Sequence, residues 1–146
     1  MKQRGKRAVS IAASAMTLAA GMVLAGPANP ANAAPNVTFR TNIFSDGSAR
    51  VDVFNDGTYA GVGMWSANPG SLADTGDTLI AHDQLADGYG IEATLDDGRT
   101  ATTRGHSAPY TDTNAKDLDE GARRLMTVCL VKGTFKDCRK DVPVNA

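Results

Sequence analysis

Four Asp-Gly pairs lie between residues 46 and 98 of this chain, at 46–47, 56–57, 87–88 and 97–98. The two central residues of a type I′ hairpin turn need positive φ, which Gly adopts freely and Asp adopts more readily than most residues. Short segments rich in Val, Thr, Phe and Tyr separate the pairs, which is typical of antiparallel β-proteins. The sequence therefore predicts an all-β fold, a single small antiparallel β-sandwich or barrel of about seven or eight strands.

Eight segments carry a strand pattern, and two longer stretches between them do not. We predict loops at 67–76 and at 105–121, where turn-forming or polar residues replace the alternation of a strand. The predicted strands are 37–44, 49–54, 59–66, 77–82, 89–95, 99–104, 123–131 and 135–142.

A two-residue turn at 56–57 places Phe54 opposite Tyr59, and this register decides which side chains share each face of the hairpin. One predicted face is aliphatic and consists of Val51, Val53, Ala60, Val62 and Met64. The other predicted face carries three aromatic residues, Phe54, Tyr59 and Trp65. A second two-residue turn at 97–98 predicts an apolar stripe made of Tyr89, Ile91, Ala93 and Leu95.

Residues 1–33 have the pattern of a secretory signal peptide. A basic start precedes a run of small and apolar residues at 8–25, and Ala31-Asn32-Ala33 supplies the A-x-A motif of a cleavage site. The run is Ala-rich and only weakly hydrophobic, so a retained membrane anchor is the weaker interpretation. We predict cleavage after Ala33, which leaves residues 34–146 as a single secreted, extracellular β-domain.

Removal of the leader changes the charge balance. Four of the 15 Lys and Arg lie within residues 1–33, so residues 34–146 hold 11 basic against 16 acidic side chains, a net charge of −5. An acidic domain without a basic stripe is poorly suited to nucleic acid or to anionic lipid. We therefore expect no nucleic-acid partner and no membrane partner after cleavage, and we expect a monomer.

Cys129 and Cys138 flank a predicted hairpin turn at Gly133-Thr134, because a type II′ turn places Gly first. Alternation from this turn makes the two cysteines directly opposed in a non-hydrogen-bonded pair, where Cα atoms lie about 4.5 Å apart. That separation is within the range of a disulfide, and export favours oxidation. The sequence predicts a disulfide that closes the last hairpin, and the spacing matches neither a C-x-x-C redox motif nor a structural zinc site.

His82 and His106 are the candidate general bases of a hydrolase. The chain has no G-x-S-x-G elbow, and neighbours such as His106 and Ser107 point to opposite faces of a strand. A small extracellular hydrolase using His82 or His106 is therefore an alternative function. We assign no catalytic residue and expect no cofactor.

Two oxygen-rich segments, 74–77 and 112–120, have the side chains that calcium prefers. Lys116 and Asp117 depart from the EF-hand pattern, which needs an oxygen ligand and a Gly at those positions. Acidic turn residues of a soluble β-domain explain both segments without a metal. The candidate calcium ligands are Asp74, Asp77, Asp112, Asp117, Asp119 and Glu120.

Phe54, Tyr59 and Trp65 are the candidate ligand contacts, since exposed aromatic rings stack on sugars or anchor protein partners. The leading interpretation is a secreted, non-catalytic binding or surface-interaction module for an extracellular glycan or protein. A second alternative is an inhibitor or effector that presents loop 105–121 to a target protein.

The Ala-rich leader, the Asp-Gly turns and the single C-terminal disulfide together resemble the short exported proteins of Gram-positive, GC-rich bacteria. This resemblance is one of composition and implies no activity.

Overall fold

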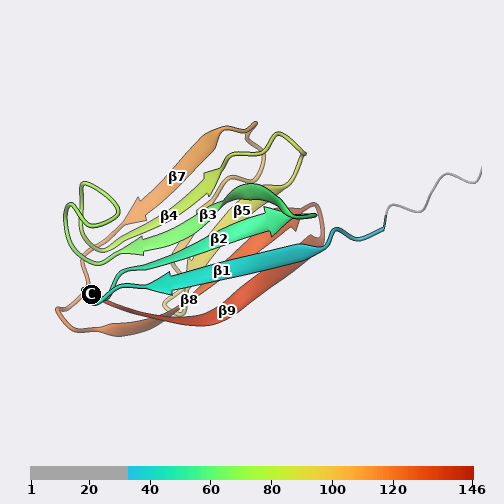
Figure 1. The fold of residues 1–146 in the computed structure, drawn as a ribbon. Helices are drawn as coiled ribbons and strands as arrows, with labels where there is room; N and C mark the ends of the chain where they lie inside the picture. Colours follow the sequence, from blue (N-terminus) through green and yellow to red (C-terminus); the bar gives the residue numbers. More distant parts are fainter. Residues whose placement is uncertain (1–32) are drawn as a thin grey trace, which may run out of the picture. The chain divides into compact units, whose positions relative to one another are not determined.

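The computed structural model describes residues 33–146, which form two antiparallel sheets packed face to face (Figure 1). The all-β prediction is confirmed, since these residues contain nine strands and no helix. The predicted signal peptide lies outside the described residues, apart from Ala33. The strands are β1 (Val37–Ile43), β2 (Ala49–Asn55), β3 (Thr58–Ser66), β4 (Thr78–Asp83), β5 (Gly90–Leu95), β6 (Thr100–Thr102), β7 (Tyr110–Ala115), β8 (Arg123–Lys132) and β9 (Phe135–Asn145).

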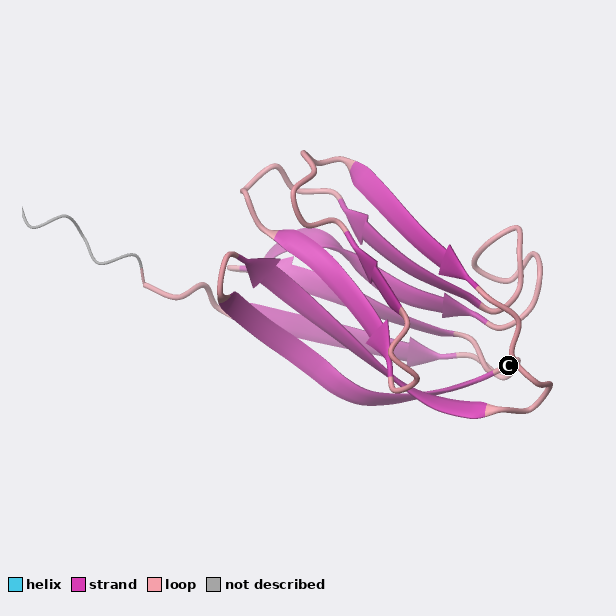
Figure 2. Cartoon of the chain, turned by 180° about the vertical axis from the view of Figure 1, so that it is seen from behind, coloured by secondary structure: helices cyan, strands magenta, loops and turns pink. Residues whose placement is uncertain are grey.

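The five-stranded sheet has the order β1-β2-β3-β4-β7, and the four-stranded sheet has the order β6-β5-β8-β9. Figure 2 shows the strands of both sheets from behind. The chain crosses between the sheets after β4, after β6 and after β7, so neighbouring strands are not all consecutive in sequence. As a result, the β4–β5, β6–β7 and β8–β9 connections lie at one end of the sandwich, where β4, β6 and β8 end and β5, β7 and β9 begin.

The hairpin at 56–57 forms as predicted at its turn, but its faces differ from the prediction. Asp56 and Gly57 both have positive φ, 47° and 80°, and Phe54 pairs with Tyr59. The register then shifts by one residue, so that Val53 pairs with Gly61 instead of Ala60. This β-bulge reverses the remaining part of β3, because a one-residue shift exchanges the two faces of a strand.

Trp65 faces the core as a consequence, and the predicted aromatic face of Phe54, Tyr59 and Trp65 is wrong in this respect. Its side chain is fully buried, and its indole N–H donates to the Asn145 carbonyl at 2.7 Å. Gly61 and Gly63 share this inward face, where a Cβ on Gly63 would overlap the Val128 methyl groups of the opposite sheet. The bulge therefore buries the largest side chain of β3 and places Gly61 and Gly63 where side chains of the other sheet pack against the strand.

The β5–β6 hairpin also turns differently from the prediction. Leu95 and Arg99 are joined by a hydrogen bond from the Leu95 N–H to the Arg99 carbonyl, so the loop has three residues, Asp96, Asp97 and Gly98. Ala93 consequently pairs with Ala101. The apolar stripe is nevertheless inward, and Ile91, Ala93 and Leu95 are buried in the core.

Residues 110–115 form β7 within the segment that the sequence analysis assigns to a loop at 105–121. The strand was missed because its sequence, Tyr-Thr-Asp-Thr-Asn-Ala, has no apolar stripe. It pairs with β4 along one edge, and its polar side chains close the seam to the other sheet. The Asp112 carboxylate accepts from the Thr102 N–H at 2.8 Å, and the Asn114 amide donates to the Thr100 carbonyl at 2.9 Å.

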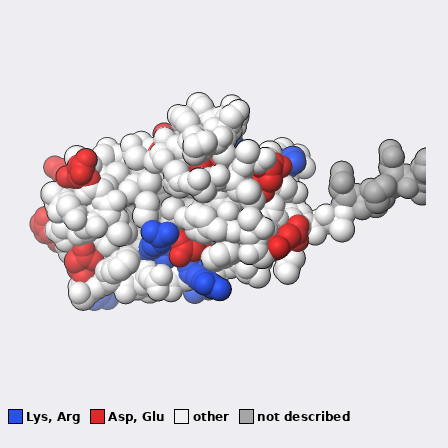
Figure 3. Space-filling model, turned by 45° about the horizontal axis from the view of Figure 1, so that its top comes forward, with Lys and Arg blue, Asp and Glu red and all other residues white. Residues whose placement is uncertain are grey.

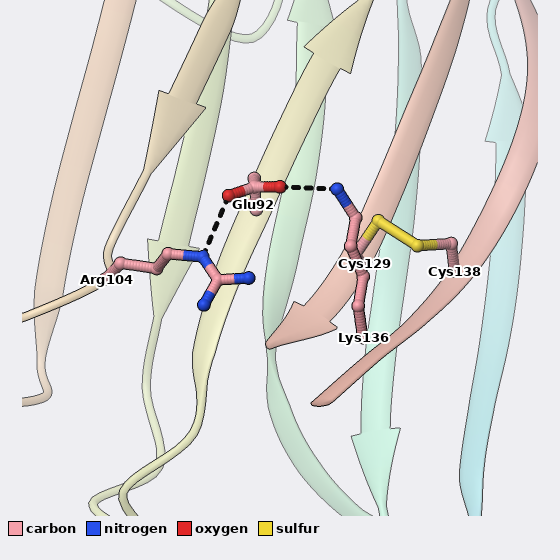
Figure 4. The surroundings of a disulfide bond; sticks show 5 residues. All are labelled: Glu92, Arg104, Cys129, Lys136 and Cys138. Carbon is pink, nitrogen blue, oxygen red and sulfur yellow. Dashed lines mark hydrogen bonds and ion pairs between the residues drawn. A yellow bond between two sulfur atoms is a disulfide. The ribbon is translucent and has the colours of Figure 1, made fainter. Parts of the chain in front are cut away.

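The disulfide prediction is confirmed. Cys129 and Cys138 are directly paired between β8 and β9, with Cα atoms 4.0 Å apart. Figure 4 shows the bond beside Glu92, whose carboxylate accepts from Lys136 at 2.7 Å and from Arg104 at 3.0 Å. Burial opposes the ionisation of Glu92, but these two cations outweigh it and lower its pKa. The disulfide and the ion pairs together tie β5, β8, β9 and the segment after β6.

Substitution of Trp65 by Ala is expected to lower the free energy of unfolding by about 3–5 kcal/mol, because it leaves a large cavity between the sheets. Phe44→Ala is the matched control, since Phe44 is 43% exposed and its removal should cost no more than about 0.5 kcal/mol. Urea unfolding followed by far-UV circular dichroism measures both. Equal costs for the two variants would contradict the inward orientation of Trp65.

Replacement of both cysteines by Ala is expected to lower the free energy of unfolding by about 2–3 kcal/mol, the loop-entropy contribution of a bond that closes a short loop. The two residues are nine positions apart in the sequence. Denaturant unfolding of the variant, and of the original protein with and without a reductant, provides the measurement. If neither the double Ala variant nor the protein in reductant is less stable than the oxidised protein, the bond does not stabilise the fold.

Candidate functional site

The outer face of the five-stranded sheet carries a continuous row of side chains across all five strands. The cross-strand pairs place Arg40, Asp52, Val62, His82 and Thr111 side by side, from β1 to β7. Cross-strand partners share a face of the sheet, and neighbouring strands lie about 4.8 Å apart. The row is therefore a strip of polar side chains interrupted once by an apolar residue.

Phe54 and Tyr59 lie next to this row on the same face. Their rings make an edge-to-face pair with centroids 5.8 Å apart, and the Arg40 guanidinium lies 4.8 Å from the centre of the Phe54 ring. Both rings are half-buried, and burial is the main cause of a raised pKa for Tyr59. Of the three predicted aromatic contacts, these two remain at the surface, whereas Trp65 does not.

Asp52 has one carboxylate oxygen available on this face. The Arg50 guanidinium donates to Oδ1 through Nε at 2.8 Å and lies 2.7 Å from it through Nη2. Within residues 33–146, no hydrogen bond to Oδ2 is formed. An oxygen that is held in place and unpaired is suited to accept a hydrogen bond from a hydroxyl group of a ligand.

His82 is held on both sides of its ring. Its Nδ1 lies 2.7 Å from the Thr111 hydroxyl, and its Nε2 lies 3.1 Å from the Gln84 side-chain oxygen. A nucleophile–base pair needs such a hydroxyl contact. His82 and Thr111, however, lie on the open face of the sheet and do not line the pocket at the end of the sandwich. Both ring nitrogens are thus engaged, and the ring is fixed in its place in the row.

A concave region of about 420 Å³ lies at the end of the sandwich where the β4–β5, β6–β7 and β8–β9 connections meet. We call it the end pocket. Residues far apart in sequence line it, among them Asp83, Tyr89, His106 and Lys132. Pockets of this size with a few convergent polar groups are typical of small-ligand sites.

Asp83 is the buried charge of the end pocket. It is the last residue of β4, has the inward orientation of Leu79 and Ala81, and is 3% exposed. Burial raises its pKa and the Asp87 carboxylate adds to this, whereas the Leu85 N–H bond and His82 act in the opposite direction. The alternation of β4 could have revealed this carboxylate, since it follows two apolar residues of the same face.

His106 lines the end pocket, but its ring is stacked on Tyr110, with centroids 3.8 Å apart. In the part of the chain that the structure describes, the histidine ring hydrogen bonds are those of His82, and no hydroxyl or carboxylate bonds to the His106 ring. Among the described residues, His106 therefore lacks the hydroxyl or carboxylate partner that a hydrolase base would need.

The predicted calcium ligands are only partly brought together. Asp74, Asp77, Asp117 and Glu120 line one shallow cavity, together with Lys116. The Asp77 Oδ2 accepts from the Leu118 N–H at 2.8 Å, and Asp112 closes the seam between the sheets. Across residues 33–146, no group of three His, Cys, Asp or Glu side chains is placed to hold a metal ion.

Charged groups are sparse over much of the surface that Figure 3 shows, where acidic side chains lie toward both ends and basic groups sit beside an acidic one between them. Among the described residues, no helix is long and apolar enough to cross a membrane. No known family model matches the chain, and no curated protein or solved structure shows significant similarity to it.

Substitution of Asp83 by Asn is expected to raise the midpoint of thermal unfolding at neutral pH. The folded state holds the Asp83 proton more tightly than the unfolded chain, so ionisation of this carboxyl destabilises the fold above its usual pKa of 3.8. The gain should disappear below that pH, where both states are protonated.

Asp137→Asn, which changes an exposed carboxylate on β9, is the matched control and should leave the midpoint nearly unchanged. Differential scanning calorimetry across a pH series measures the difference. A lower midpoint for Asp83→Asn at neutral pH would contradict the expected cost of burying this charge.

Proposed function

We propose that this protein is an exported, non-catalytic binding module whose five-stranded outer face binds an extracellular glycan. The observation that carries the proposal is the row from Arg40 to Thr111 with the Phe54–Tyr59 pair beside it. Aromatic rings pack on the apolar faces of sugar rings, while fixed side-chain oxygens and nitrogens exchange hydrogen bonds with sugar hydroxyls.

The polar groups of the face support this proposal because they are already oriented. Asp52 is held by Arg50, and His82 is held by Thr111 and Gln84, so little side-chain entropy is lost when a ligand binds. Asp52 Oδ2 also retains its capacity to accept a hydrogen bond, whereas both ring nitrogens of His82 are already bonded. A rigid sheet face is a more accurate support for such groups than a loop.

A glycan explains this composition better than a protein partner does. The centre of a stable protein interface is a closely packed apolar patch, and aromatic anchors usually insert into pockets there. On this face Val62 and Ile80 are already covered by their neighbours, and the two aromatic rings are half-buried. The surface therefore offers ring faces and hydrogen-bonding groups rather than an apolar centre.

The hydrolase alternative has less support. His82 has a hydroxyl partner but no surrounding pocket, and His106 has a pocket but no hydroxyl or carboxylate partner within residues 33–146. The effector alternative through loop 105–121 also has less support, because β7 occupies the middle of that segment.

Tyr59→Ala is expected to weaken binding of a matching oligosaccharide by about tenfold, since truncation of a central aromatic contact commonly costs more than about 1 kcal/mol. A panel of cell-wall and plant oligosaccharides is first screened by thermal shift, and the affinity for the best ligand is then measured by isothermal titration calorimetry. Tyr110→Ala is the matched control, because Tyr110 stacks on His106 away from this face.

The proposal fails if no oligosaccharide of the panel stabilises the protein, or if Tyr59→Ala and Tyr110→Ala lose affinity equally. Binding of a protein through the same face, with oligosaccharides inactive, would replace the glycan by a protein partner.

A further inference from the structure

The end pocket has a chemistry that the proposed glycan-binding face does not use. Its lining includes the buried acidic residue Asp83 and the exposed basic residue Lys132. The two residues come from β4 and β8, which belong to different sheets. Within residues 33–146, neither residue has a partner of opposite charge, and this indicates which ligand groups the pocket can bind.

Asp83 has an unused hydrogen-bond acceptor. Oδ1 accepts from the Leu85 N–H at 3.2 Å, and this is the only hydrogen bond to the carboxylate from the described part of the chain. A carboxylate that is 3% exposed has lost most of its water, and no cation forms an ion pair with it within residues 33–146. A buried charge of this kind is strongly stabilised by a cation brought by a ligand.

Lys132, in turn, lacks an anionic partner among residues 33–146. Its Nζ lies 4.5 Å from the centre of the Tyr89 ring and 3.4 Å from the Asp87 carbonyl oxygen, and no carboxylate pairs with it among residues 33–146. Arg104, the other cation of the lining, is already bound to Glu92 and to the Gly133 carbonyl. Lys132 is therefore the cation of the pocket that remains able to bind an anion.

The walls around these two groups are held in place by the fold. Thr103 is buried, and its hydroxyl bonds both the N–H and the carbonyl of Ile91, which anchors the segment after β6 to β5. The side chain of Asp87 accepts from the Asn55 amide at 2.7 Å and from the Tyr89 N–H at 2.9 Å. The pocket is thus largely formed before a ligand arrives.

We propose that the end pocket binds a small zwitterion, a free amino acid or a short peptide, with its ammonium group at Asp83 and its carboxylate at Lys132. The charges exclude the simpler alternatives. The second ammonium group of a diamine would be repelled by the Lys132 cation. The second carboxylate of a dicarboxylate would be repelled by the buried Asp83 anion. A neutral molecule leaves both charges without a counter-ion. A volume of about 420 Å³ accommodates a ligand of the proposed size.

The test is a titration of the purified, isotope-labelled protein with free amino acids and dipeptides, followed by two-dimensional nitrogen–proton NMR. The amides of Gly90, Gly105 and Gly133, which line the pocket, should shift. N-acetylated amino acids, amino-acid amides and a diamine test each charge in turn. Loss of either ligand charge is expected to weaken binding by at least about tenfold, as for a charge-assisted hydrogen bond. A preference between amino acids and dipeptides identifies which of the two is bound.

Two variants test the protein side of the proposal. Asp83→Asn keeps the acceptor for Leu85 and should abolish the dependence on the ligand ammonium. Lys132→Met should abolish the dependence on the ligand carboxylate. Asp137→Asn and Lys140→Ala, both exposed on β9, are the controls and should bind as the original protein does.

Absence of pocket shifts at millimolar ligand overturns the proposal, as does equal binding of the N-acetylated and free forms. This inference does not rest on the glycan-binding proposal. Oligosaccharide affinity and its loss in Tyr59→Ala are measured at a different face, so either proposal can fail alone.

Discussion

The close approach of the two sheets at Gly61 and Gly63 is the constraint on which the rest of the structure depends. These positions of β3 face the core without a side chain, and Val128 and Ile91 of the opposite sheet occupy the space. Farther along β3, Trp65 fills the interior, and its indole N–H is bonded to the Asn145 carbonyl near the end of β9. A single strand therefore decides how closely the sheets pack and ties β3 to the last strand. The bulge after Tyr59 makes this arrangement possible, since it turns Gly61, Gly63 and Trp65, which are alternate residues of β3, toward the inner face.

The two proposed sites use this framework in different ways. The outer face of the five-stranded sheet depends on strand register alone, because cross-strand pairing aligns Arg40, Asp52 and His82 in one row. The end pocket depends on the crossings between the sheets, which bring Asp83 and Lys132 to one end of the sandwich. A buried carboxylate without a cation partner is unfavourable to folding, and the Cys129–Cys138 bond and the Glu92 ion pairs stabilise the neighbouring sheet. Stability that is given up at a binding site is commonly supplied elsewhere in a domain.

Much of the fold could be predicted because its signals are local. The Asp56-Gly57 turn, the pairing of Cys129 with Cys138 and the inward stripe of Ile91, Ala93 and Leu95 each follow from a few neighbouring residues. The strand β7 could not be predicted in this way, since an edge strand with polar side chains on both faces has no hydrophobic period. Of the candidate site, Phe54 and Tyr59 were found from the turn register, whereas the end pocket was missed apart from His106. Its other members have no sequence motif in common, and only the sheet crossings bring them together.

The sequence by itself determined the class of the fold, the hairpin turns at 56–57 and 133–134, the disulfide and the acidic balance of residues 34–146, because turn chemistry, alternation and charge are properties of short segments or of composition. The tertiary structure decided which face of β3 is buried and which charges meet at the end pocket. An insertion of one residue in a ladder reverses the faces of a strand, and the turn at 56–57 with its Phe54–Tyr59 pair is the same with or without it. The decision comes from the other sheet, where Val128 leaves no room for a side chain at position 63 and the interior accommodates Trp65.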